Sequence, residues 1–169
     1  GFSPDGSLVT FWGRRPAGSG RPEISIWAAP LLGGPPRPYL EGVAEYDWSA
    51  NGERLLFHTP GPGDPTFVRD AAPDAEPRQI FSAPAGLHSH FPAWSPDGSF
   101  LLFVQGSVPD RMDLWRTDGS GGGARQLTRH QARVSHPVFV DARTVLYLAG
   151  DPDGSGPSIR SLDLRTGAE

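Results

Sequence analysis

The sequence predicts an all-β fold, and three observations carry this prediction. A motif of an aromatic residue, a polar turn and a short apolar run recurs along the chain, with leading aromatics at Phe2, Trp48, Trp94 and Phe139. The spacings between these aromatics are 46, 46 and 45 residues. The apolar runs are short and are bounded by turn residues, which is typical of antiparallel strands. A fixed repeat of this length indicates a solenoid, a propeller or an array.

The turn inside the motif has a defined chemistry. Its first and third copies read Ser-Pro-Asp-Gly, and its second copy reads Ser-Ala-Asn-Gly. Proline presets φ, Asp or Asn bonds its own backbone, and Gly adopts positive φ without steric cost. We therefore interpret the column of turn residues as structural rather than catalytic: Asp5, Gly6, Asn51, Gly52, Asp97 and Gly98. The fourth copy lacks the Gly and is one residue shorter, so its turn is expected to differ.

Four short strands are expected in each complete repeat, which is what one blade of a propeller needs. The fold class is thus a partial β-propeller of about four four-stranded antiparallel blades. The chain is expected to form a single propeller portion, residues 1–169, with blades at about 1–44, 45–90, 91–134 and 135–169, of which the first and last are incomplete.

The strands are justified in chain order by the motif and its turns. The first blade lacks most of its opening strand and is expected to contain Leu8–Trp12, Glu23–Trp27 and Arg37–Leu40. The second is complete, with Tyr46–Trp48, Arg54–His58, Thr66–Arg69 and Arg78–Phe81. The third has residues 90–94, Phe100–Val104, Met112–Thr117 and, after the Gly-rich turn Asp118–Gly123, Ala124–Thr128. The last has Ser135–Val140, Thr144–Leu148 and Ser158–Asp163.

The second strands are mostly apolar on both faces. Between the paired columns Val9/Phe11, Leu55/Phe57, Leu101/Phe103 and Val145/Tyr147 lie Thr10, Leu56, Leu102 and Leu146, of which three are apolar. Such a strand is covered on both sides, and neighbouring blades supply this cover. An open arc leaves two blade faces bare, which predicts poor solubility or self-association of this piece. The remaining blades of a parent chain are therefore expected partners.

Composition excludes several kinds of function. The net charge of −4 does not favour a nucleic-acid partner. All 15 basic residues are Arg, so every lysine-based mechanism is absent, and without cysteine there are no disulfides or thiolate metal sites. No apolar run is long enough to span a membrane. The chain starts within a repeat and without Met, so we expect it to be a piece of a longer protein.

Histidines are the candidate ligand-binding residues. His88 and His90 alternate and so project from the same side of an extended segment. First strands line a propeller's central channel, so His88, His90, Arg133 and His136 are expected to approach one another near its mouth. Among these, His88, His90 and His136 are candidate metal ligands, since imidazoles with an open position hold Zn or Mn. The alternative is solvated loop histidines bonded to the backbone. His58 and His130 are interpreted as structural or exposed.

The segment Pro92–Thr128, with Trp-Ser-Pro-Asp-Gly, Leu-Leu-Phe, Leu-Trp-Arg-Thr-Asp-Gly and Arg-Gln-Leu-Thr, resembles the WD-like repeat of TolB-type β-propellers. The resemblance covers nearly the whole chain. It implies a portion of a closed ring and, by analogy with TolB, a periplasmic or cell-envelope location in bacteria; the residues themselves do not indicate a compartment. Segment 108–163 looks most like the sensor propellers of bacterial serine/threonine kinases and winged-helix regulators. Related propellers precede the catalytic domain of prolyl-oligopeptidase-like peptidases, and some related lyases bind metal through channel histidines.

No catalytic motif accompanies these features. The Gly-rich stretch Asp118–Gly123 has neither a following helix nor the Gly-Lys-Ser/Thr of a phosphate loop, and no Gly-x-Ser-x-Gly motif supplies a nucleophile. We therefore expect a non-catalytic module without a cofactor that binds or senses a protein or peptide. The alternatives are the gating propeller of a serine peptidase, with catalysis on an absent domain, and a metal-dependent lyase-type propeller.

Overall fold

The structure is a computed structural model that describes residues 1–14, 20, 23–72, 74–108, 110–151, 154 and 156–169. The described residues form fourteen strands in four antiparallel sheets and no helix, which confirms the predicted all-β fold. Within these residues, therefore, no helix is available to cross a membrane.

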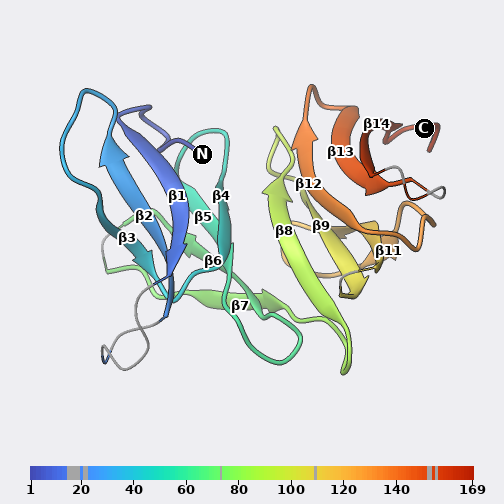
Figure 1. Cartoon of the computed structure of the whole chain (residues 1–169), viewed down its shortest axis with the longest axis horizontal. Helices are drawn as coiled ribbons and strands as arrows, with labels where there is room; N and C mark the ends of the chain where they lie inside the picture. The colour runs from blue at the N-terminus through green and yellow to red at the C-terminus, as the bar shows by residue number, and fades with distance from the viewer. Residues whose placement is uncertain (15–19, 21–22, 73, 109, 152–153, 155) are drawn as a thin grey trace.

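Each sheet is a meander of consecutive strands. The first contains β1 (Leu8–Arg14), β2 (Ile24–Pro30) and β3 (Arg37–Glu41), and the second β4 (Glu45–Trp48), β5 (Arg54–His58), β6 (Thr66–Asp70) and β7 (Arg78–Phe81). The third contains β8 (His88–Trp94), β9 (Phe100–Ser107), β10 (Arg111–Asp118) and β11 (Arg125–Gln126), and the fourth β12 (Val134–Phe139), β13 (Thr144–Gly150) and β14 (Pro157–Asp163). The sheets succeed one another in chain order across the molecule, with β4 and β8 in its middle (Figure 1).

Two strand boundaries differ from the repeat units expected from sequence. The expected divisions at 90/91 and 134/135 fall just inside β8 and β12, because these strands begin at His88 and Val134. The fourth strand expected at Ala124–Thr128 shrinks to β11. Its ladder ends because the Thr128 hydroxyl, not a backbone carbonyl, accepts the Leu114 N–H at 3.0 Å.

The first three motif turns share one hydrogen-bond pattern. In each, a serine hydroxyl donates to the Asp or Asn side chain at 2.6–2.7 Å, and that same side-chain oxygen accepts a backbone N–H two residues on. The following glycines, Gly6, Gly52 and Gly98, have φ of 67–71°. The fourth turn differs, since Asp141 instead accepts the N–H groups of Arg143 and Thr144.

The cores lie between neighbouring sheets. Leu55 and Phe57 face the first sheet, whereas Leu56 packs with Val68, Trp94 and Leu101 toward the third. The third and fourth sheets meet at Phe100, Leu102 and Val145. Each buried large side chain contributes about 1.5–3 kcal/mol through the loss of hydrated apolar surface.

The leading aromatics of the repeats have different environments. Trp94 is 4% exposed between the second and third sheets, and the Arg54 guanidinium lies 4.3 Å from its ring centroid. Trp48 and Phe139 are partly buried against inter-sheet cores. Phe2 is 62% exposed, because its sheet is the first of the arc and has a neighbour on one side only.

Candidate functional site

A groove of about 750 Å³ runs along the inner side of the arc. Residues of β1, β4, β8 and β12, which are the innermost strands of the four sheets, line it. Aromatic side chains form much of its wall, and Trp12 remains 50% exposed there. The groove is therefore an accessible, largely apolar surface to which all four sheets contribute.

Two carboxylates of β4 connect the second sheet to the third. The Asp47 Oδ2 atom accepts the Trp94 N–H at 2.7 Å, and the Glu45 Oε2 atom accepts the Phe91 N–H. Burial raises the pKa of Asp47. The backbone N–H groups of Trp94 and Trp48, which donate to its carboxylate, act in the opposite direction. Acceptors on β4 thus satisfy backbone donors of β8 across the gap between the sheets.

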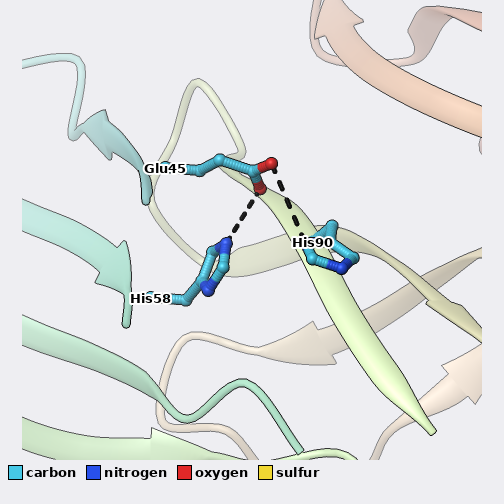
Figure 2. A group of neighbouring side chains, drawn as sticks. All are labelled: Glu45, His58 and His90. Atoms are coloured by element: carbon cyan, nitrogen blue, oxygen red, sulfur yellow. Dashed lines mark hydrogen bonds and ion pairs between the residues drawn. The ribbon is translucent and has the colours of Figure 1, made fainter. Parts of the chain in front are cut away.

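Three histidines and two acids gather beside this junction. The Glu45 carboxylate lies between the imidazoles of His58 from β5 and His90 from β8 (Figure 2). Its oxygens are 3.1 Å from His58 Nε2 and 3.8 Å from His90 Nδ1. On the other side of His90, the Asp64 Oδ2 atom is 3.7 Å from His90 Nε2 and 2.8 Å from His88 Nδ1.

The cluster is shielded from solvent to different degrees. His58 is 1% exposed, Asp64 is buried, His90 and Glu45 are partly buried, and His88 is exposed. Burial lowers the pKa of His90, and the neighbouring Glu45 carboxylate opposes this shift. A buried neutral imidazole offers a free nitrogen lone pair, which is the form that binds metal ions.

Two of the four candidate ligand-binding residues predicted from the sequence, His88 and His90, lie together. The rings of His88 and His90 stack with their centroids 5.9 Å apart. The ring of the exposed His136 instead lies against that of Phe91, with centroids 4.4 Å apart and the planes tilted by 37°, and the exposed Arg133 accepts the Gly150 N–H through its carbonyl. Within the described residues, no contact joins His136 or Arg133 to the pair. Phe91 and His136 occupy matching bulge positions with φ of 53° and 52°, which turn them away from the preceding residues.

Sequence reasoning missed the acids of this cluster and the role of His58. One signal was available, because the hairpin register pairs Glu45 with His58 and follows directly from the pairing of Trp48 with Leu55. Asp64 carried no such signal. It lies in an irregular Gly- and Pro-rich loop with φ of 44°, and its approach to His88 depends on the packing of two sheets.

Solved structures similar to this chain share its fold. TolB from Acinetobacter baumannii has a TM-score of 0.75 at 17% identity, over 96% of this chain and 40% of that one. A putative TolB from Agrobacterium tumefaciens has a TM-score of 0.75 at 19% identity, over 99% and 61%. A puromycin-hydrolyzing peptidase of Mycobacterium tuberculosis has a TM-score of 0.66 at 18% identity, over 99% and 27%.

These comparisons establish a TolB-like propeller fold. The chain spans less than two thirds of the length of either TolB structure, so it corresponds to a partial propeller. No protein-family model matches the sequence, and a search of curated proteins found no match. At these identities the likeness concerns the fold alone, and function must be argued from the groove and the cluster.

Proposed function

We propose that this portion of a TolB-like propeller is a non-catalytic binding module whose inner groove receives a peptide segment of a partner protein. The observation that carries the proposal is the groove itself, which is lined by the innermost strands of all four sheets. A concave apolar surface built on rigid strands is the usual form of a binding site.

The exposed aromatic side chains support this function. Trp12 and Val138 line the groove and are both exposed. Large apolar groups gathered in one concavity favour an interaction site, whereas single apolar groups scattered over a surface do not. Aromatic residues also supply much of the binding energy where proteins meet. We therefore expect the partner to insert an apolar or aromatic side chain beside Trp12.

The charge of the groove indicates the kind of peptide. Among the described side chains that line it, those formally charged at neutral pH are Glu45 and Asp47. The whole chain also carries a net charge of −4. An acidic segment would meet like charge, which disfavours binding. The expected ligand is therefore a neutral or basic peptide with an apolar anchor.

Selection from a displayed random peptide library tests this function. The selected peptide is labelled, and its affinity is measured by fluorescence polarisation with the wild type and with Trp12→Ala. Loss of the indole is expected to weaken binding at least about tenfold, as for a buried aromatic anchor. Leu32→Ala is the matched control, because Leu32 is fully exposed and does not line the groove. Peptides that bind both variants as tightly as the wild type would contradict the groove as their site.

The likeness to the puromycin-hydrolyzing peptidase favours a second candidate. In this alternative the chain is part of a gating propeller, and catalysis belongs to a separate domain of a parent protein. The groove would then pass substrates without retaining them. The expected result is that no peptide survives selection, together with a Gly-x-Ser-x-Gly motif in the parent reading frame.

A further inference from the structure

We propose that Glu45, His58 and His90 bind one divalent transition-metal ion of the zinc class at the junction of the second and third sheets. The three side chains come from β4, β5 and β8. Two imidazoles and one carboxylate are a ligand set that zinc accepts while it keeps one position open. The site shares Glu45 with the wall of the groove, but metal binding is a different function from peptide binding, and its test does not depend on the peptide.

The distances suit a single ion. Two donor atoms, each about 2.0–2.1 Å from one zinc ion at the tetrahedral angle, are about 3.3–3.4 Å apart. The Glu45 Oε2 atom lies 3.1 Å from His58 Nε2, and its Oε1 atom lies 3.8 Å from His90 Nδ1, so each imidazole is within about 0.5 Å of this separation from one carboxylate oxygen. All three ligand atoms lie within 4.8 Å of one another. Small rotations of the side chains bring them onto one centre.

The second nitrogen of each imidazole also has a suitable neighbour. A histidine that binds metal through one nitrogen usually donates the N–H of the other to a carbonyl or carboxylate, which fixes its tautomer. The His58 Nδ1 atom lies 3.5 Å from the Thr59 carbonyl oxygen. The His90 Nε2 atom lies 3.7 Å from Asp64 Oδ2. The Thr59 carbonyl is thus within hydrogen-bond reach of His58, whereas Asp64, which His88 and the Ser89 N–H hold in place, supplies a negative charge beside the outer nitrogen of His90.

The backbone holds the ligands before any ion arrives. Glu45 and His58 are directly paired residues of adjacent strands. The Glu45 carboxylate is also held by the Phe91 N–H, one residue after His90. Ligands on paired strands have less freedom to lose on binding than ligands on loops.

The chemistry of the ligands selects the type of metal. Imidazole nitrogens suit zinc, copper, iron and nickel, whereas calcium and magnesium prefer oxygen ligands throughout. An ion here would join the second sheet to the third. Because it binds the folded chain, it is expected to raise the unfolding temperature.

Calorimetric titration of the untagged 169-residue chain with ZnCl₂ tests the proposal. The expected result is one ion per chain and a higher unfolding temperature, reversed by a chelator. Glu45→Gln is expected to lower the affinity at least about tenfold. The matched control is Asp47→Asn, because Asp47 also accepts a β8 N–H but does not belong to the cluster. Equal losses in the two variants, or no binding by the wild type, would overturn the site.

Two further measurements fix the ligands. Asp64 and His88 form a competing cluster with His90, so His88→Ala separates the two possibilities. If the ion binds at the proposed site, His88→Ala is expected to lower the affinity for Zn²⁺ by less than about tenfold. If this substitution abolishes binding, the ion binds instead to the cluster that contains Asp64. If Glu45→Gln fails to fold, the visible spectrum of Co²⁺ bound to the wild type still reports imidazole ligation, and a spectrum of hexa-aquo Co²⁺ would refute it.

Discussion

The third residue of each Ser-x-x-Gly turn, Asp5, Asn51 or Asp97, accepts several hydrogen bonds through its side chain. Asp97 receives the Ser95 hydroxyl and the N–H and hydroxyl of Ser99. These hydrogen bonds stabilise the charged form, so they lower the pKa of Asp97. The Ser3 hydroxyl and the Ser7 N–H likewise lower the pKa of Asp5 to about 2. At Asn51 an uncharged amide oxygen fills the same place.

Asp97→Asn is expected to cost little at neutral pH and to change the response to acid. Because the folded pKa of Asp97 is lowered, its ionised form stabilises the fold above the unfolded value near 3.8, and this contribution is lost as the pH falls toward the folded value. The variant is therefore expected to unfold at most a few degrees below the wild type at pH 7, with the difference vanishing in acid. Thermal unfolding followed by circular dichroism between pH 7 and pH 2 measures this, and a difference independent of pH would contradict it.

Sequence patterns at the residue scale predict contacts only where backbone periodicity fixes them. The proximity of His88 and His90 follows from strand alternation, and the rings do stack. The Glu45–His58 pair follows from hairpin register. By contrast, Asp64 reaches His88 from a loop 24 residues earlier, and no local pattern encodes such an approach. The sequence therefore predicts the histidines of the cluster better than its acids.

At the scale of elements, the hairpin between β10 and β11 shows why a Gly-rich turn is needed. Its residues 118–123 close a turn in which Asp118 accepts the N–H groups of Ser120 and Gly122. A Cβ atom on Gly121 would lie 1.8 Å from the carbonyl oxygen of Ile80 in β7, and Gly121 has φ of 94°. A Cβ atom on Gly123, with φ of 62°, meets nothing within 4 Å. The turn thus docks on the preceding sheet through one glycine.

Substitution of these two glycines separates backbone strain from docking. Gly123→Ala is expected to cost about 1–2 kcal/mol, the usual cost of the left-handed region for alanine. Gly121→Ala adds displacement of β7 and is expected to cost about 3 kcal/mol or more. Urea unfolding of both variants measures the difference. Equal costs would show that the turn moves away from Ile80 freely.

Strand positions were predictable because turns and apolar runs alternate at a fixed period. β11 is the exception and shows the limit of this signal. Thr128 has strand propensity, but its hydroxyl donates to Asp113 at 2.9 Å while it accepts the Leu114 N–H. This side-chain network replaces the ladder and shortens the strand.

At the scale of the whole molecule, burial of the second strands distinguishes inner sheets from outer ones. Leu55, Leu56 and Leu102 are almost wholly buried, because a sheet lies on each side. On the outer sheets one face stays open, where Phe11 and Leu146 are 44% and 37% exposed. The sequence predicted this difference, because strands that are mostly apolar on both faces need a sheet on each side, and an open arc leaves two of these faces bare. The groove was not predictable in the same way, since it depends on how the four sheets curve together.

The open face of the fourth sheet leads to a prediction about association. Leu148 pairs with Ile159 across β13 and β14, so both project to the face that Leu146 shares. Covering this face removes apolar surface from water at about 25 cal/mol per Å². We therefore expect the isolated chain to form dimers or larger species in size-exclusion chromatography with light scattering.

Introducing charged residues on this face distinguishes association through it from non-specific aggregation. The double variant Leu146→Glu/Ile159→Glu is expected to shift the chain toward monomer, because paired sheets would bury both carboxylates without partners. Leu32→Glu is the control, since Leu32 is fully exposed and lies outside the strands of every sheet. If both variants associate like the wild type, the contact lies elsewhere, for example on the Phe11 face of the first sheet. If the wild type instead stays monomeric at high concentration, the chain is stable with the outer faces of its first and fourth sheets exposed to water. Its stability would then not depend on further blades.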